Sequence, residues 1–202
     1  MACMHRRLAA SILFLGWLMT TTNAPAAEPI RFAVRFPAPQ THYVEVEARF
    51  PTAGRAEIEL MMPVWTPGSY LVREYAGKVE DFAAKKPDGS ALEWSRSRKN
   101  RWKVATAGTD EVVATYRVYG RSMSVQANWI DASFAMLQGA ATFMTPADGV
   151  ARPHEVVVDP APGWKRSITG LPAAPGGKPH HYVAPATPRS TNSPSTASPI
   201  SS

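Results

Sequence analysis

Apolar and polar side chains alternate strictly over three successive runs of the chain. From Ile30 to Phe36 every second residue is large and apolar, with Arg31 and Arg35 between them. The same period of two recurs from His42 to Phe50 and from Arg55 to Met62. This period places alternate side chains on opposite faces of an extended strand. The pattern therefore predicts three strands, each with one buried and one solvated face.

Short strand-like runs separated by turn residues continue along the chain. Pro51-Thr52-Ala53-Gly54 has turn composition, and Pro87-Asp88-Gly89-Ser90, between Val79–Lys85 and Ala91–Ser95, is typical of a hairpin. No segment has a convincing helical period, so the chain is expected to be all-β, an antiparallel sandwich or a set of strongly curved sheets. The other predicted strands are 101–105, 111–121, 124–129, 139–144 and 155–159, with short helical turns at 72–76 and 132–137.

The first 27 residues have the pattern of a cleaved signal helix. Arg6 and Arg7 precede an apolar run, Leu8 to Met19, which is shorter than the about 20 residues that span a membrane. Ala24-Pro25-Ala26 then supplies a small-residue cleavage site. We expect export to the periplasm or secretion, and no stable membrane anchor after cleavage.

Residues 184–202 differ from the central part, residues 28–183, which we take as one domain. They are rich in proline, serine and threonine, and Ile200 is their only large apolar side chain. Such a composition cannot offset the entropy lost on ordering. It predicts a disordered tail.

Composition limits the function classes. The single cysteine, Cys3, lies in the predicted signal segment, so stability must come from a hydrophobic core rather than from disulfides. The 22 basic and 16 acidic residues give a net charge of +6. The surplus is modest and forms no long basic stripe, which together with export argues against nucleic-acid binding.

The stretch from Met62 to Tyr75 combines a turn sequence with large aromatic side chains. Pro67 presets φ at about −65° and Gly68 accepts a positive φ, the pair that a type II turn needs. Trp65 and Tyr70 flank this turn, and each ring buries apolar area while keeping a polar group. The stretch predicts a well-anchored turn between two strands.

A second block follows the first along the chain, made of Tyr116–Arg121, Asn128-Trp129-Ile130-Asp131 and Gly139–Phe143. In this order the two blocks resemble the N-terminal β-domain of the PDZ-containing glycyl aminopeptidase-like metallopeptidases (metallopeptidase family sixty-one). The resemblance implies a saddle-like β-sandwich without catalytic residues, which packs against a zinc-peptidase domain and borders its substrate cleft. It also implies that the chain departs from the family near Ala186, through a frameshift or an early stop.

Catalytic motifs are missing from this sequence. A zinc peptidase needs His-Glu-x-x-His on a helix, but His154-Glu155-Val156-Val157-Val158 has valine at the second histidine position and favours a strand. His180 and His181 are adjacent and would point to opposite sides of an extended chain. Ser69 follows a glycine in a turn, not in a nucleophile elbow. We therefore expect no catalytic centre, metal or cofactor in this chain.

Surface recognition remains as the role of the motif residues. The candidate interaction surface consists of Trp65, Pro67, Gly68, Tyr70, Arg73, Asn128, Trp129 and Asp131. The leading hypothesis is a non-catalytic scaffold and docking surface for a metallopeptidase domain absent from this chain, with peptide as a second partner. The alternative is a free-standing periplasmic module that binds a peptide or a glycan.

Overall fold

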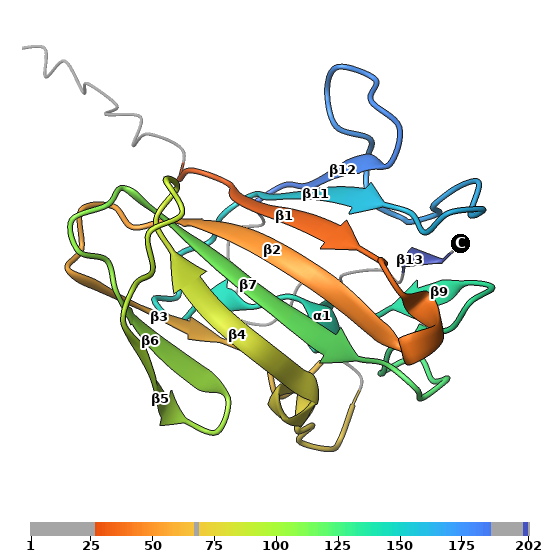
Figure 1. Cartoon of the computed structure of the whole chain (residues 1–202), viewed down its shortest axis with the longest axis horizontal. Coiled ribbons are helices and arrows are strands. Elements are labelled where there is room, and N and C mark those ends of the chain that lie inside the picture. Colours follow the sequence, from red (N-terminus) through yellow and green to blue (C-terminus); the bar gives the residue numbers. More distant parts are fainter. Residues whose placement is uncertain (1–26, 67–68, 187–199, 202) are drawn as a thin grey trace, which may run out of the picture.

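The computed structural model describes residues 27–66, 69–186 and 200–201 of the 202-residue chain. One large sheet lies over two smaller ones (Figure 1). The strand order in the large sheet is β12-β11-β1-β2-β7-β4. Its strands are β1 (Ile30–Arg35), β2 (Tyr43–Pro51), β4 (Val79–Lys85), β7 (Glu111–Tyr119), β11 (His154–Asp159) and β12 (His181–Ala184).

The smaller sheets have the orders β10-β3-β6-β5 and β13-β9-β8. The all-β fold with antiparallel sheets is confirmed, and in the described ranges no helix is long and apolar enough to cross a membrane. The remaining elements are β3 (Glu57–Met61), β5 (Trp94–Arg98), β6 (Arg101–Ala105), β8 (Trp129–Ile130), β9 (Ala135–Leu137), β10 (Thr145–Pro146), β13 (Ile200–Ser201), the helix α1 (Gly139–Thr142) and 3₁₀ turns at Pro39–Thr41 and Tyr75–Lys78.

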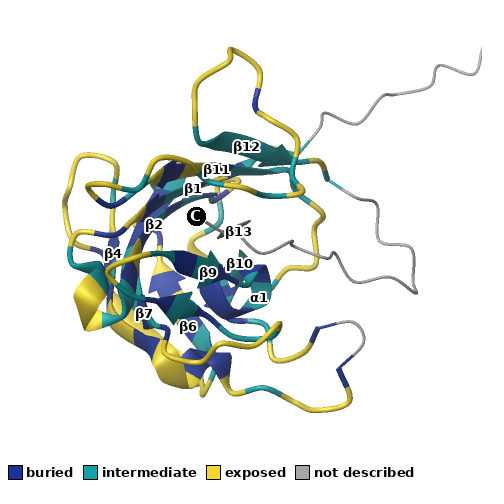
Figure 2. Cartoon of the chain, turned by 90° about the vertical axis from the view of Figure 1, so that its right-hand side faces the viewer, coloured by how far each residue is buried: buried dark blue, intermediate teal, exposed yellow. Residues whose placement is uncertain are grey.

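The core lies between the large sheet and the layer beneath it. β2 and β7 pair antiparallel from Tyr43↔Tyr119 to Pro51↔Glu111, and their alternate residues point inward. The inward side chains form one core cluster with residues of the second sheet and α1. Figure 2 colours the buried positions dark blue. Among the most buried are Phe50, Val44, Val46, Leu60, Met62, Trp102, Val104, Ile130, Leu137 and Met144.

One strand pair departs from the antiparallel pattern. β11 runs parallel to β1, from Ile30↔His154 to Arg35↔Asp159, and β12 then turns back antiparallel on β11. In the chain, β11 follows all strands of the smaller sheets except β13, and it lies at the edge of β1 in the same direction. Alternation along a single strand does not reveal this partner, because partner choice depends on the whole path of the chain.

Several local predictions were wrong. Gly139–Met144 forms α1 and a short extension rather than a strand, because the Gln138 side chain accepts a hydrogen bond from the Ala141 N–H and caps the helix. Of the predicted strand 124–129 only Trp129 is extended, since serine hydroxyls and carbonyls fold the preceding residues into turns. The predicted turn 132–137 contains strand β9 instead.

The predicted hairpin at Pro87–Ser90 is correct as a turn but not as a strand pair. The Lys86 N–H donates to the Ser90 carbonyl at 2.8 Å, and Lys85 bridges to Ala91. Beyond this bridge β4 stays in the large sheet while β5 joins the second one. The turn therefore carries the chain across the edge of the sandwich.

Both predicted terminal segments fall largely outside the described residues. This holds for most of residues 1–27 and for most of 184–202. Within the second segment, Ala184 ends β12, and Ile200–Ser201 pairs antiparallel with β9.

Tyr116 joins the large sheet to α1, and its loss should destabilise the fold. Its buried hydroxyl donates to the Thr142 carbonyl at 3.0 Å and accepts from the Met144 N–H at 3.1 Å. Tyr116→Phe leaves both backbone groups unpaired, so the free energy of unfolding should fall by about 1–3 kcal/mol in urea denaturation. Tyr119→Phe is the control, because the partly exposed Tyr119 has no hydroxyl hydrogen bond within the described residues. Equal losses for the two variants would contradict this role.

Candidate functional site

The loop between β3 and the 3₁₀ turn at Tyr75 holds the first sequence motif. The Ser69 N–H donates to the Thr66 carbonyl at 3.1 Å. The Trp65 indole N–H donates to the Ser69 carbonyl at 2.6 Å, and Thr66 and Ser69 are both buried. The residues that flank the predicted turn are thus anchored to one another, in a loop and not between two strands. Pro67 and Gly68 lie outside the described residues.

A second loop, residues 121–128, begins where β7 ends. At Gly120 a Cβ atom would lie 2.2 Å from Ile130 Cδ1 and 2.8 Å from Asn128 Cβ, so only glycine permits this close approach. The Gly120 N–H donates to the His42 carbonyl at 2.8 Å, and the Gly120 carbonyl accepts from the Ile130 N–H at 2.9 Å. The end of the central strand pair therefore fixes where this loop starts.

Asn128 holds the second loop from inside. It is 4% exposed, its carboxamide oxygen accepts from the Gln138 N–H at 2.8 Å, and its amide nitrogen donates to Thr142 Oγ1 at 3.1 Å. Its carbonyl accepts from the Ser122 N–H at 3.0 Å. Asn128 therefore belongs to the packing under the loop and not to its surface.

Arg73 connects the two loops. Its guanidinium donates to Gln126 Oε1, and its backbone N–H donates to the Val64 carbonyl at 2.6 Å. The Arg73 Nε atom is buried without a hydrogen-bond partner among the described residues. Arg73 thus links the two loops through its guanidinium, and its Nε atom faces the interior.

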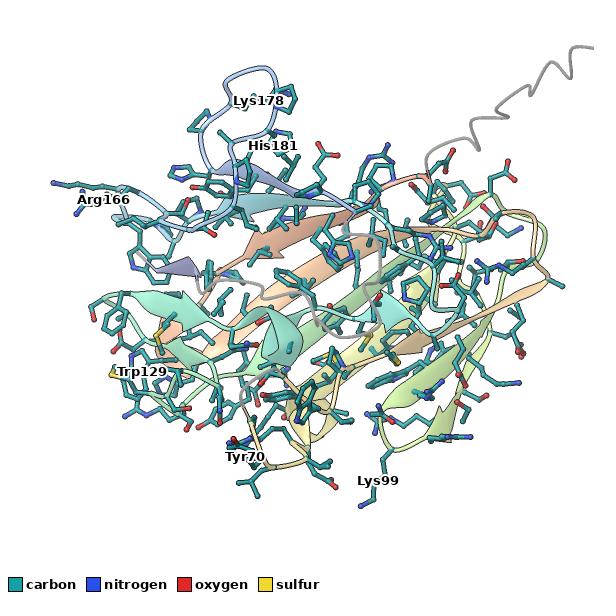
Figure 3. All side chains as sticks on the ribbon, turned by 180° about the vertical axis from the view of Figure 1, so that it is seen from behind. Tyr70, Lys99, Trp129, Arg166, Lys178 and His181 are labelled. Carbon is teal, nitrogen blue, oxygen red and sulfur yellow. The ribbon has the colours of Figure 1, made fainter. Side chains whose placement is uncertain are left out.

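The two loops together expose a row of apolar side chains, here termed the apolar ridge: Val64, Trp65, Tyr70, Leu71, Val72, Met123 and Val125. Tyr70 is fully exposed, and Val125 and Val72 are 86% and 75% exposed. Residues 64–72 and 122–127 contain no charged residue. Figure 3 shows Tyr70 at one end of the molecule. Exposed apolar side chains gathered in this way are typical of interaction surfaces, which makes the ridge a candidate site.

Trp129 and Asp131 lie beside the ridge but are occupied by their own neighbours. Asp131 accepts from the Trp129 indole N–H at 3.1 Å and from the Ser133 N–H and hydroxyl at 2.7 and 2.6 Å. The Ser133 hydrogen bonds lower the pKa of Asp131 to about 2. The Arg121 guanidinium lies 4.9 Å from the centre of the Trp129 ring. Asp131 is therefore an ionised turn-forming residue with no free proton to exchange at neutral pH.

The histidine candidates are placed apart. His154 begins strand β11, so it and Val158 share no helix face, and its ring packs edge-on against Phe32. His181 contacts Glu155 at 2.6 Å, whereas His180 contacts the Ser167 hydroxyl at 2.7 Å. Within the described ranges, no group of three or more His, Cys, Asp or Glu side chains could hold a metal ion.

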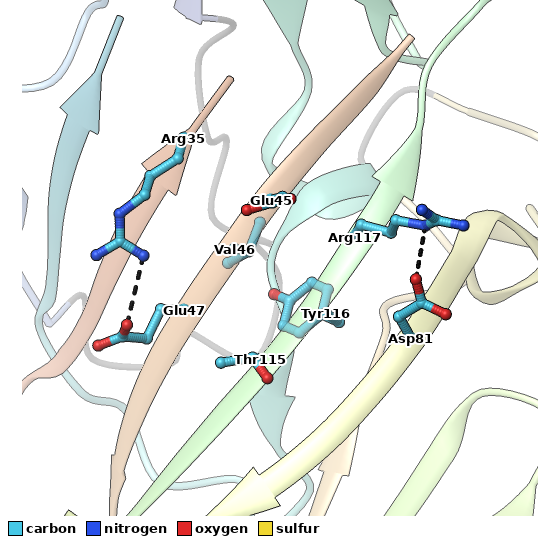
Figure 4. Close-up of a pocket in the computed structure, with 8 residues that line it drawn as sticks. All are labelled: Arg35, Glu45, Val46, Glu47, Asp81, Thr115, Tyr116 and Arg117. Carbon is cyan, nitrogen blue, oxygen red and sulfur yellow. Dashed lines mark hydrogen bonds and ion pairs between the residues drawn. The ribbon is translucent and has the colours of Figure 1, made fainter. Parts of the chain in front are cut away.

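A shallow pocket of about 240 Å³ lies on the outer face of the large sheet (Figure 4). Four of its charged residues are paired, Arg35 with Glu47 at 3.4 Å and Arg117 with Asp81 at 3.0 Å, whereas Glu45 has no ion pair among the described residues. The pocket contains no buried acid, base or nucleophile free to react. The apolar ridge is therefore the stronger candidate.

The geometry defines a β-sandwich that presents an uncharged apolar ridge at one end. The sequence model of the peptidase M61 N-terminal domain matches residues 31–199, and the chain belongs to this family. The match runs past Ala186, the position near which the sequence suggested a departure from the family.

One solved structure shares this fold. The crystal structure of an aminopeptidase N family protein from Idiomarina loihiensis has a TM-score of 0.73 at 23% identity, over 85% of this chain and 29% of that protein. A mutant M1 zinc metallopeptidase from Deinococcus radiodurans, bound to a Tyr-Ser-Ala substrate, has a TM-score of 0.45 at 12% identity, over 87% and 38%. No curated protein sequence matches the chain. The chain thus spans less than a third of the first of these proteins.

Sequence analysis missed part of the ridge. Val64, Leu71, Val72, Met123 and Val125 were not among the candidate residues, since a few aliphatic residues near polar ones look ordinary. The signal that could have found them is the absence of charge across both loops.

Truncation of Asn128 should lower the stability of the fold, whereas truncation of Tyr70 should leave it almost unchanged. Asn128→Ala removes buried hydrogen bonds and leaves the Gln138 N–H unpaired, so we expect a loss of about 1–3 kcal/mol of unfolding free energy. Tyr70→Ser removes a fully exposed ring and should change it by less than about 0.5 kcal/mol. Urea denaturation of both variants measures this. A Tyr70→Ser loss as large as that of Asn128→Ala would show that Tyr70 packs in the fold.

His154 should make the protein less stable in acid. Burial lowers the pKa of His154, and the nearby positive charge of Arg152 lowers it further. Below pH about 6.5 the unfolded chain takes up this proton more readily than the folded one, so unfolding becomes easier as the pH falls. Urea denaturation of the wild type and of His154→Phe checks this. The free energy of unfolding is measured between pH 5 and 8, in steps of about one pH unit. An unchanged pH slope in the variant would remove His154 as the cause.

Proposed function

We propose that this chain is the non-catalytic scaffold of a zinc peptidase and that the apolar ridge is its docking surface for the catalytic domain. The observation that carries the proposal is the ridge itself, an uncharged and exposed row of side chains on two loops that are tied together. A surface that stays in water gains nothing from such a row, whereas burial against a partner contributes about 25 cal/mol for each Å² of apolar area.

Family membership supports the nature of the partner. The chain belongs to the peptidase M61 N-terminal domains, and it spans 29% of the aminopeptidase N family protein whose fold it shares. In this proposal the partner domain supplies the zinc ion and the hydrolysis of peptides, while this chain supplies a rigid contact surface. The N-terminal charge and hydropathy pattern supports export, so we place the protein in the periplasm or outside the cell.

The test is binding in trans to the catalytic domain of an M61 peptidase made without its own N-terminal domain. Isothermal calorimetry should detect binding of the wild-type chain. Tyr70→Ser/Leu71→Ser/Val72→Ser should weaken it by about 100-fold or more, since truncated central apolar side chains each cost about 1 kcal/mol or more.

A matched control removes apolar side chains outside the ridge. Val150→Ser/Val157→Ser/Ile168→Ser changes three residues of 42–50% exposure on other parts of the chain and should leave binding intact. Equal losses for both triple variants would contradict docking through the ridge. Chelator-sensitive aminopeptidase activity of the chain alone would contradict the non-catalytic role. Binding of peptides or glycans without any affinity for the catalytic domain would favour a free-standing module instead.

A further inference from the structure

The connection between β11 and β12 carries a second unusual surface. Residues 160–184 contain no aspartate or glutamate, but they include Lys165, Arg166 and Lys178. All three side chains are exposed, and none has a hydrogen bond or an ion pair within the described part of the chain. We term the connection, residues 160–180, with these three cations the basic excursion. In Figure 1 this connection projects beyond the edge of the large sheet.

Carboxylates pair with many of the cations on the two sheets. On the outer face of the large sheet, Arg49 contacts Glu111 at 3.0 Å, and Arg117 contacts Glu80 at 2.8 Å. The exposed Lys103 on the second sheet also contacts Glu57 at 2.9 Å. The connection differs from these sheets because residues 160–184 contain no carboxylate side chain that could pair with its three cations.

Side-chain hydrogen bonds join the two ends of the connection, where Ser167 on the outgoing segment meets His180 and Tyr182 on the returning one. The Ser167 hydroxyl lies 2.7 Å from His180 Nδ1 and 2.6 Å from the Tyr182 hydroxyl, and Tyr182 donates to the Ser167 carbonyl at 3.1 Å. In the outgoing segment, the Trp164 indole N–H donates to the Ala132 carbonyl at 3.2 Å. These hydrogen bonds give the connection a defined shape. In Figure 3 Lys178 lies at the upper edge of the molecule and Arg166 at its left side, whereas Tyr70 lies at the lower edge.

We propose that the basic excursion binds the surface of an anionic phospholipid membrane. Its cations do not converge on a buried cavity, as a site for one small anion would require. They are spread over an exposed connection, which suits a surface that presents many phosphate groups at once. Ile168, half exposed beside Arg166, adds an apolar side chain that can enter the interfacial region. The contact is electrostatic and reversible, and it leaves the apolar ridge free.

Vesicle co-sedimentation tests this binding. The chain is used without residues 1–27, because their apolar run would itself bind lipid and the whole described core begins at Ile30. The chain should bind vesicles of equal parts phosphatidylglycerol and phosphatidylcholine at about 50 mM salt, and release them at about 500 mM salt. Lys165→Gln/Arg166→Gln/Lys178→Gln should bind on the order of 100-fold more weakly.

A matched variant separates this surface from net charge. Lys85→Gln/Arg98→Gln/Lys99→Gln removes the same charge from the β4 end and the β5–β6 hairpin, and it should bind vesicles within about threefold of the wild type. An equal loss in the two variants would overturn the proposal, as would equal binding to pure phosphatidylcholine vesicles or no binding at all. Capture of polyglutamate by the basic excursion without vesicle binding would assign the surface to an acidic polypeptide instead, and would also overturn it.

Discussion

The antiparallel pairing of β2 with β7 is the interaction on which the rest of the structure depends. Its inner face supplies the centre of the core, and Tyr116 extends from it to the backbone around α1. At its end, Gly120 lets Ile130 and Asn128 approach closely, and Asn128 then holds the loop that carries Gln126. The apolar ridge is therefore positioned by a continuous series of contacts that starts in the central strand pair.

Much of the fold could be predicted because alternation reports burial directly. Ile30–Phe36, His42–Phe50 and Arg55–Met62 are close to the observed β1, β2 and β3. Partner choice was not accessible in the same way. The parallel pairing of β11 with β1, and the transfer of the chain from β4 to β5 across two sheets, depend on the path of the whole chain. The helix α1 escaped prediction because capping by Gln138, rather than periodicity, decides the local structure.

The candidate site was predictable in its position but not in its composition. The turn sequence around Trp65 and Tyr70 indicated a contact surface, and these two residues are exposed. Arg73 links the loops through a contact with Gln126, 53 residues away. Asn128 is buried through its contact with Gln138, which belongs to a separate segment. No pattern within either segment reveals such contacts.

The central claim is that the ridge, and no other part of this chain, contacts the catalytic domain. Hydrogen–deuterium exchange of the chain, alone and with the catalytic domain of an M61 peptidase, tests it most directly. The account predicts that amide protection increases at residues 64–73 and 121–128, while the β5–β6 hairpin and residues 160–184 exchange as before. Protection confined to those other segments, or no change at the two ridge loops, would contradict it.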